Sequence, residues 1–250
     1  RNMVNIDTVY QKVLAIANKE QRGYITPQEF NLFADYAQKD IFEKYFYDVN
    51  QFKRIPGNST DYSNMLNNLE EKISLFEIFD QEVTVVNDQG DINLTNDIPD
   101  LYRLGRVTVN YNQEIRSVVE QRQIKDISIY GEGGLTGYTK ARPVYVRFKP
   151  RFTAALDRIK IYPHPSQDSN IDKVRISYIK QPQKPNWSGI EVNGSFLYNE
   201  TDSTNFELHP EEENLLIVKI LQLAGISMKD FGLAQAAAQK EVNDINNEKS

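Results

Sequence analysis

The stretch from Thr26 to Phe52 constrains the fold most strongly, because its sequence predicts one long helix. Thr26 is a good N-cap residue, Pro27 suits the first helical position, and Glu29 can complete a capping box. No glycine or proline interrupts the residues that follow. At 1.5 Å per residue the helix would be roughly 37 Å long, so the chain must be organised around it.

Apolar side chains occur on two faces of this predicted helix, whereas an ordinary surface helix shows one stripe. One face holds Phe30, Phe33, Ala34, Ala37, Ile41 and Tyr45, and the other holds Leu32, Tyr36, Phe42, Phe46 and Val49. The helix is therefore expected to pack on more than one side. Either the core of the same chain or a neighbouring subunit could cover the second face.

Further helical patterns lie at both ends of the chain. We expect Asp7 to cap a first helix, and apolar spacing from Leu66 to Phe76 predicts a third. Pro210 starts another helix, which Gly225 ends. This helix is apolar nearly all round, so we expect it to be deeply buried.

A final helix is predicted from Ser227 toward Glu248, with a thin apolar stripe. The stripe consists of Phe231, Ala234, Ala238, Val242 and Ile245. Near-heptad spacing of this kind is typical of helices that pack between subunits, so these residues are our candidate subunit interface. A terminal helix lying on its own domain is the alternative.

Between the helical ends the sequence predicts β structure. Two-residue alternation is clearest at 143–148, 158–162 and 173–179, and Asn193-Gly194 predicts a hairpin between 190–192 and 196–198. Residues 98–105 resemble a short helical turn, and residues 121–130 suit either a helix or a strand. The predicted fold is α+β: a helical bundle built from N- and C-terminal helices (1–80 and 207–250), with an inserted antiparallel β-rich domain (81–206).

No pattern in the chain indicates catalysis, a cofactor or a metal site. There are two histidines and no cysteine, and no P-loop or serine elbow occurs. The glycine-rich stretch with Gly131, Gly133, Gly134 and Gly137 predicts a mobile loop that could dock on a partner. The formal net charge of -6 argues against a protein that grips nucleic acid through a basic face. We expect no membrane span and no signal peptide.

Several phrases in the chain resemble a group of virion structural proteins from tailed phages. They are VYQKVL (9–14), GYITPQEF (23–30), YF (45–46), RPVY (142–145), IKIYP (159–163), YIKQP (178–182) and FELHP (206–210). The resemblance extends over most of the chain, but none of these phrases carries known chemistry. It implies a non-enzymatic head-to-tail adaptor in the virion, assembled in the host cytoplasm.

The resemblance also implies partners. Such an adaptor would form a ring, commonly dodecameric, that docks on the portal protein and meets a downstream tail protein. Genomic DNA would pass through the channel without specific binding. The alternatives are another virion ring, tail or capsid-associated protein, or a β-domain module that binds a carbohydrate or receptor and uses Trp187.

Overall fold

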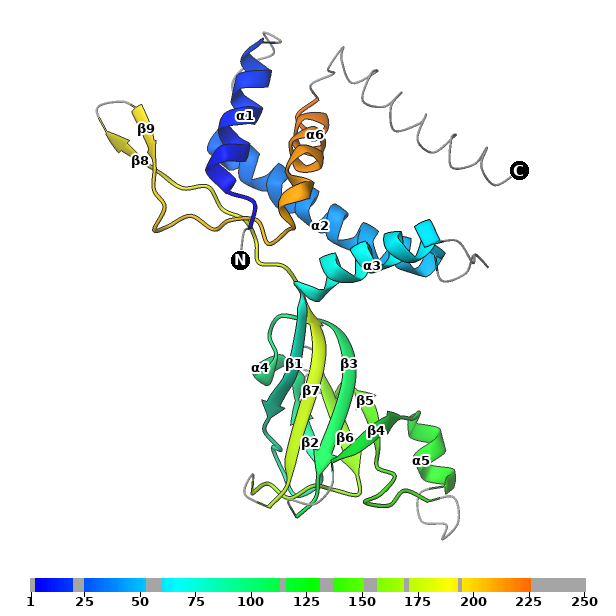
Figure 1. Cartoon of the computed structure of the whole chain (residues 1–250). Helices are drawn as coiled ribbons and strands as arrows, with labels where there is room; N and C mark the ends of the chain where they lie inside the picture. Colours follow the sequence, from blue (N-terminus) through cyan, green and yellow to red (C-terminus); the bar gives the residue numbers. More distant parts are fainter. Residues whose placement is uncertain are drawn as a thin grey trace. The chain divides into compact units, whose positions relative to one another are not determined.

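The computed structural model describes residues 3–19, 25–52, 60–112, 116–130, 137–150, 157–168, 171–192 and 195–225. Its contacts divide the chain into two compact units. The helical unit comprises Arg1–Leu75 and Pro182–Ser250, and the sheet unit comprises Phe76–Gln181. The α+β prediction is confirmed: helices from the two ends of the chain pack together, and a curled, mostly antiparallel sheet is inserted between them in the sequence (Figure 1).

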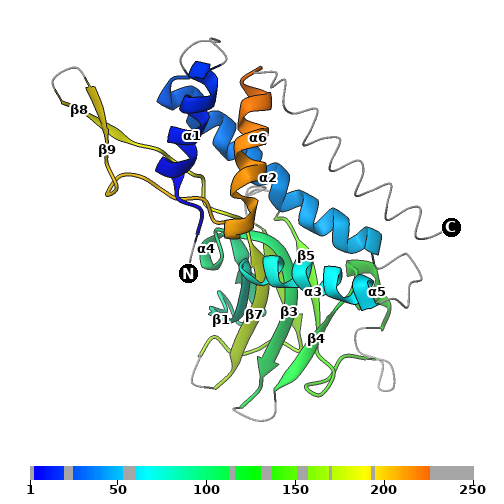
Figure 2. The ribbon, with the colours of Figure 1, turned by 45° about the horizontal axis from the view of Figure 1, so that its top comes forward.

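The helical unit is built from four described helices and one ribbon. The helices are α1 (Ile6–Lys19), α2 (Pro27–Phe52), α3 (Thr60–Ser74) and α6 (Glu213–Leu223), and a 3-10 turn, η1 (Pro210–Glu212), leads into α6. Helix α6 contacts both α1 and α2, as Figure 2 shows. The ribbon pairs β8 (Gly189–Val192) with β9 (Ser195–Tyr198), which confirms the predicted hairpin; its turn lies outside the described residues.

The ends of the helices follow local sequence rules in most cases. The capping box of α2 is present: Thr26 N donates to Glu29 Oε2 at 3.0 Å, and Glu29 N donates to Thr26 Oγ1 at 3.3 Å. The bond from the Thr26 backbone lowers the pKa of Glu29. The prediction for α1 is wrong by two residues, because Asn5 Oδ1 accepts the bond from Thr8 N at 3.0 Å and the helix begins at Ile6.

The first predicted face of α2 forms the centre of the helical unit. Phe30, Ala34, Ala37 and Ile41 are at most 1% exposed, and Tyr45 is 4% exposed. The second predicted face is divided, since Phe42 is also buried, whereas Leu32 and Tyr36 are not. A 26-residue helix can therefore anchor a core and still present apolar side chains to its surroundings.

Two amide side chains on α2 hold the chain where it returns from the sheet unit. Asn31 Nδ2 donates to the Trp187 carbonyl at 3.0 Å, and Trp187 N donates to Asn31 Oδ1 at 2.7 Å. Gln38, which is fully buried, donates to the Gln183 carbonyl at 2.7 Å and accepts from Glu207 N at 3.0 Å. These bonds explain why residues 182–206 group by contact with the helices, whereas the predicted ranges assign them to the β-rich region.

A half-buried ion pair joins α3 to η1. Lys72 Nζ lies 2.6 Å from Glu212 Oε1, and their side chains are 20% and 9% exposed. The pKa of Tyr45 is raised, mainly by its burial and secondly by the nearby charge of Glu212. Lys72 also lies 6.0 Å from the centre of the Tyr45 ring. The pair therefore ties α2, α3 and the C-terminal part of the chain together.

Replacing Lys72 with methionine is expected to lower the free energy of unfolding by about 2 kcal/mol, because Glu212 would be left as an unpaired buried carboxylate. Chemical denaturation followed by far-UV circular dichroism measures this change. Lys12→Met is the matched control, since its pair with Glu213 is more exposed and should contribute under about 1 kcal/mol. Equal losses in the two variants would contradict the assignment.

The sheet unit contains a seven-stranded sheet in the order β1-β7-β3-β4-β5-β6-β2. The strands are β1 (Glu77–Val83), β2 (Asp91–Asn93), β3 (Leu101–Asn110), β4 (Ser117–Gln121), β5 (Val144–Phe148), β6 (Arg158–Tyr162) and β7 (Lys173–Lys180). Neighbours are antiparallel except β4 and β5. Two short helices, α4 (Leu94–Asp97) and α5 (Ile124–Tyr130), lie between strands in the sequence. Residues 121–130, whose sequence suits either a helix or a strand, are therefore mostly helical.

The sheet curls until its two edges meet. Val85, which follows β1, forms a bridge with Ile92 of β2, and Val86 N donates to the Asp91 carbonyl at 2.7 Å. The enclosed core contains the residues that alternation predicts to face inward, including Ile159, Ile161, Val174, Ile176 and Tyr178. One hydrophobic cluster therefore stabilises the sheet unit by itself.

The predicted helical turn at residues 98–105 is wrong, because residues 101–105 belong to β3. Its pairing is non-local: Leu101 lies opposite Lys180, and Leu104 lies opposite Tyr178. Gly105 is needed at the irregularity that follows, since a Cβ there would lie 2.6 Å from the Ser177 carbonyl oxygen. Pairing with a distant strand thus overrides the local turn preference.

Tyr178 makes the stability of the sheet unit depend on pH. Its hydroxyl donates to Asp100 Oδ1 at 3.0 Å, and burial followed by this bond raises its pKa to about 12. Unfolded tyrosine titrates near about 10, so between these values the folded chain binds more protons. The contribution of Tyr178 to the free energy of unfolding is therefore complete below a pH of about 10 and is lost as the pH rises toward about 12.

We expect the denaturant midpoint of the wild-type chain to fall more steeply than that of Tyr178→Phe in this alkaline range. The variant lacks the titrating hydroxyl, so only the difference between the two curves reports on Tyr178. Denaturation series at several alkaline pH values measure it. Parallel curves would show that Tyr178 does not retain its proton more tightly in the folded chain.

Candidate assembly surface

Three aromatic and aliphatic side chains lie exposed on one face of α2. Leu32, Tyr36 and Tyr47 are 64%, 63% and 63% exposed, and their spacing places them on the same side of the helix. Leu32 and Tyr36 belong to the second apolar face predicted from the sequence, whereas Tyr47 was not part of that prediction. Nothing in the described part of the chain buries them. We call these three residues the α2 face.

A groove of about 430 Å³ runs between α1 and α6. Its walls are formed by Lys12, Ala15 and Ile16 of α1, and by Asn214, Ile217, Val218 and Leu221 of α6. The prediction that α6 is deeply buried all round is therefore wrong. Leu216, Ile220 and Leu221 are fully buried, but Val218 is half-buried and Leu223 is 39% exposed. No element in the described ranges covers this apolar flank of α6.

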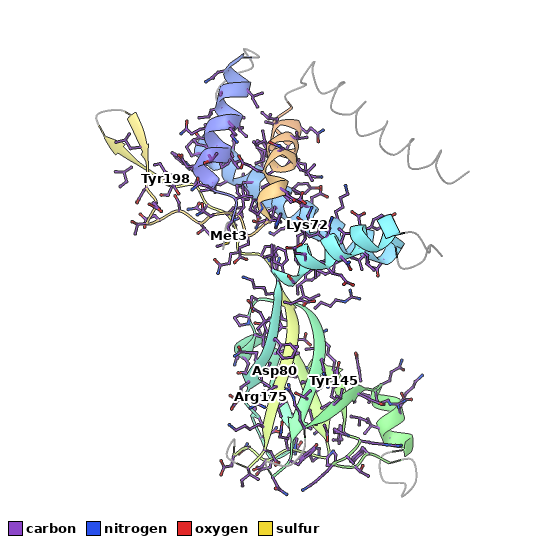
Figure 3. All side chains as sticks on the ribbon, in the orientation of Figure 1. Met3, Lys72, Asp80, Tyr145, Arg175 and Tyr198 are labelled. Carbon is purple, nitrogen blue, oxygen red and sulfur yellow. The ribbon has the colours of Figure 1, made fainter. Side chains whose placement is uncertain are left out.

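The β8–β9 ribbon is held firmly at its base by Trp187. The indole Nε1 donates to Asp7 Oδ1 at 2.9 Å, and the ring centre lies 4.5 Å from that of Tyr10 and 6.1 Å from that of Tyr198, which Figure 3 labels. The ring also covers Gly189, where a Cβ would lie 2.7 Å from its edge. Trp187 is 4% exposed, so it is unavailable as a stacking platform for a sugar.

Beyond this base the ribbon presents an apolar pair. Ile190 and Leu197 lie opposite each other and are 54% and 56% exposed. A two-stranded hairpin is only marginally stable by itself. The ribbon is thus a projection with a rigid base and an apolar surface, which suits contact with another protein.

The sheet unit has its own exposed aromatic residue at an edge strand. The register of β1 shifts between Ile78 and Gln81, and Asp80 adopts a φ of 57°. Two hydrogen bonds from Arg116 hold the Asp80 side chain, one of them at 2.6 Å, and lower its pKa. Phe79 next to it is 76% exposed. A bulge of this kind can turn one side chain outward, and here that side chain is apolar.

Charge is unevenly shared between the two units. The helical unit has 21 acidic and 14 basic residues, whereas the sheet unit has 14 acidic and 15 basic residues. The negative net charge of the chain therefore belongs to the helical unit. Surfaces of that sign repel nucleic-acid phosphates.

Most of the predicted interface and loop residues lie outside the described part of the chain. Phe231, Ala234, Ala238, Val242 and Ile245 follow the last described residue, and Gly131, Gly133 and Gly134 fall in an internal range that is not described. Gly137 is described and is half-buried. These assignments therefore stay predictions.

The described residues contain no group of three or more metal-binding side chains. His209 Nδ1 accepts from Glu211 N at 3.4 Å, and His164 Nδ1 lies 3.0 Å from the Ile161 carbonyl. Both contacts are with nearby backbone, so each histidine stabilises a local turn. No helix in the described ranges is long and apolar enough to cross a membrane.

Two residues of the α2 face, Leu32 and Tyr36, belong to the apolar excess seen in the sequence. The α1–α6 groove and the role of Gln38 were not predicted. The groove depends on two helices that are about 200 residues apart in the chain, and no local pattern reports it. The buried Gln38 was a visible signal, since a polar residue on an apolar helix face requires a partner. Comparison of the sequence with models of protein families and with curated proteins gives no match.

Proposed function

We propose that this chain is a non-enzymatic structural protein of a tailed-phage virion that assembles into a ring. Within that class we propose a head-to-tail adaptor, which docks on the portal and continues the DNA channel toward the tail. The observation that carries the proposal is the apolar surface that the described residues of the helical unit leave uncovered. The α2 face, the α1–α6 groove and the ribbon pair Ile190 and Leu197 are separate apolar patches on that one unit.

Separate patches of this kind support a ring. A ring contact is heterologous, so each subunit must present two different complementary surfaces. Contiguous apolar surface on a small protein typically marks a contact with another protein. The resemblance of phrases along most of the chain to tailed-phage virion proteins supplies the biological setting of the proposal.

The charge distribution is compatible with DNA passing through such a ring. The helical unit is net negative, and a channel lined by such a surface would not retain phosphates. Binding of genomic DNA would need a basic lining with several phosphate contacts. We therefore expect no detectable affinity for duplex DNA at physiological salt, and tight binding would contradict this part of the proposal.

Mass photometry of the purified chain, alone and with the portal protein of the same phage, tests the proposal. We expect a ring whose mass is a multiple of the 28.9 kDa subunit, and cryo-electron microscopy should place it below the portal. A monomer that binds neither portal nor tail protein would reject the proposal. A ring located elsewhere in the virion would favour the alternative of another virion ring or capsid-associated protein.

The carbohydrate-binding alternative loses its main support, because Trp187 is buried and bonded within the helical unit. A glycan array tests whether the chain binds any carbohydrate. Binding that survives Trp187→Phe would revive a receptor-binding role through another surface.

A further inference from the structure

The α1–α6 groove has the geometry of a site for a third helix. On α6 the lining residues Asn214, Ile217, Val218 and Leu221 are spaced by three, one and three positions, so they form one helical face. On α1 the lining residues are spaced in the same way from Lys12 to Ile16. Ala15 keeps the groove open, since its small side chain would let another backbone approach closely. Helices recognised in grooves supply anchors at this same spacing.

The chain contains one stretch outside the described residues that matches this groove. Twenty-five residues follow Gly225, and among them Phe231, Ala234 and Ala238 share the predicted apolar stripe. From Phe231 to Ala238 is seven residues, about 11 Å along a helix, and from Asn214 to Leu221 is the same distance. One large anchor followed by two small residues suits a groove that is apolar but of limited volume.

We propose that the groove of one copy receives residues 231–238 of a second copy of this chain. This inference rests on the proposed ring, because a ring needs two unlike surfaces on each subunit, and the groove and this segment are such a pair. Gly225, with a φ of 72°, ends α6. Five residues, 226–230, lie between Gly225 and this segment.

Cysteine crosslinking of the 250-residue chain tests the proposal directly, since its sequence has no cysteine. The two variants are Ala15→Cys, in the groove, and Ala238→Cys, in the segment. One variant carries a mass tag, and the two are mixed under mild oxidation. We expect a disulfide-linked heterodimer on a non-reducing gel. Asn67→Cys, which places a thiol on an exposed position of α3, replaces Ala15→Cys in the control and should give no heterodimer.

The double variant Ala15→Cys/Ala238→Cys separates the second copy from the same chain. A disulfide within single chains, with no heterodimer in the mixture, would overturn the proposal and show that the segment folds back on its own groove. Absence of both products would also overturn it. Mass photometry of the same samples tests the ring independently: rings without the crosslink refute only the groove assignment, whereas monomers without it refute the proposed function as well.

A groove variant adds a second readout. Val218→Glu places a carboxylate in the half-buried wall of the groove, and we expect it to abolish the heterodimer when it is combined with Ala15→Cys. Far-UV circular dichroism should show an unchanged helix content. A folded Val218→Glu variant that still forms the crosslink would show that the segment does not enter the groove.

Discussion

Replacing Trp187 with alanine is expected to lower the free energy of unfolding by about 4 kcal/mol, the largest effect of any single substitution considered. The ring is almost fully buried, and its removal would leave a cavity beside Tyr10 and Tyr198. The indole also donates to Asp7, so the substitution removes a hydrogen bond that links the ribbon to α1. Loss of Trp187 should therefore loosen the base of the ribbon and weaken the helical unit.

Far-UV circular dichroism during chemical denaturation is the suitable measurement, because Trp187 is the only tryptophan and its fluorescence disappears with it. Trp187→Phe is the matched control. It keeps most of the aromatic packing and loses the hydrogen bond, so a cost of about 1–2 kcal/mol is expected. If Trp187→Ala were as stable as Trp187→Phe, ring packing would contribute little, and the proposed role of this residue would be wrong.

The double substitution Leu32→Glu/Tyr36→Glu is expected to convert the proposed rings into monomers. Both side chains are more than 60% exposed, so the change should leave folding intact. At a subunit interface, buried carboxylates in place of apolar anchors would cost about 2 kcal/mol or more per contact, roughly 30-fold in Kd. Mass photometry across a dilution series measures this change.

The control for this experiment adds the same two charges elsewhere. Asn67→Glu/Asn68→Glu changes two exposed positions on α3 and should leave assembly unchanged. Dissociation of both variants would indicate a general effect of charge. Rings that persist in Leu32→Glu/Tyr36→Glu would show that the α2 face lies outside the subunit interface.

The fold could be predicted well where it depends on local sequence. The capping box at Thr26, the alternation in β6 and β7, and the Asn-Gly hairpin each describe neighbouring residues, and each is confirmed. Prediction failed where distant segments decide the outcome. Residues 101–105 become extended through pairing with β7, and the side chain of Asp80, whose φ is positive, is held by Arg116, which directly precedes β4.

The candidate surface, too, could be predicted only where it depends on local sequence. Excess apolar residues on α2 could be counted in the sequence, which left open whether the core or a neighbour covers the second face; Leu32 and Tyr36 of that face are exposed. The buried core of α2 and this exposed face could not be separated fully, because Phe42 belongs to the first although its position suggested the second. Spacing gives the direction of a side chain, whereas burial depends on which other helices pack there.

The sheet unit begins and ends at adjacent points. Lys180 N donates to the Phe76 carbonyl at 2.9 Å, and Glu77 lies opposite Ile179. A segment with neighbouring ends can be exchanged at two closely placed junctions, because the chain on either side need not shift to accommodate a replacement. Recombination could thus exchange the whole sheet unit and leave the helical unit unaltered.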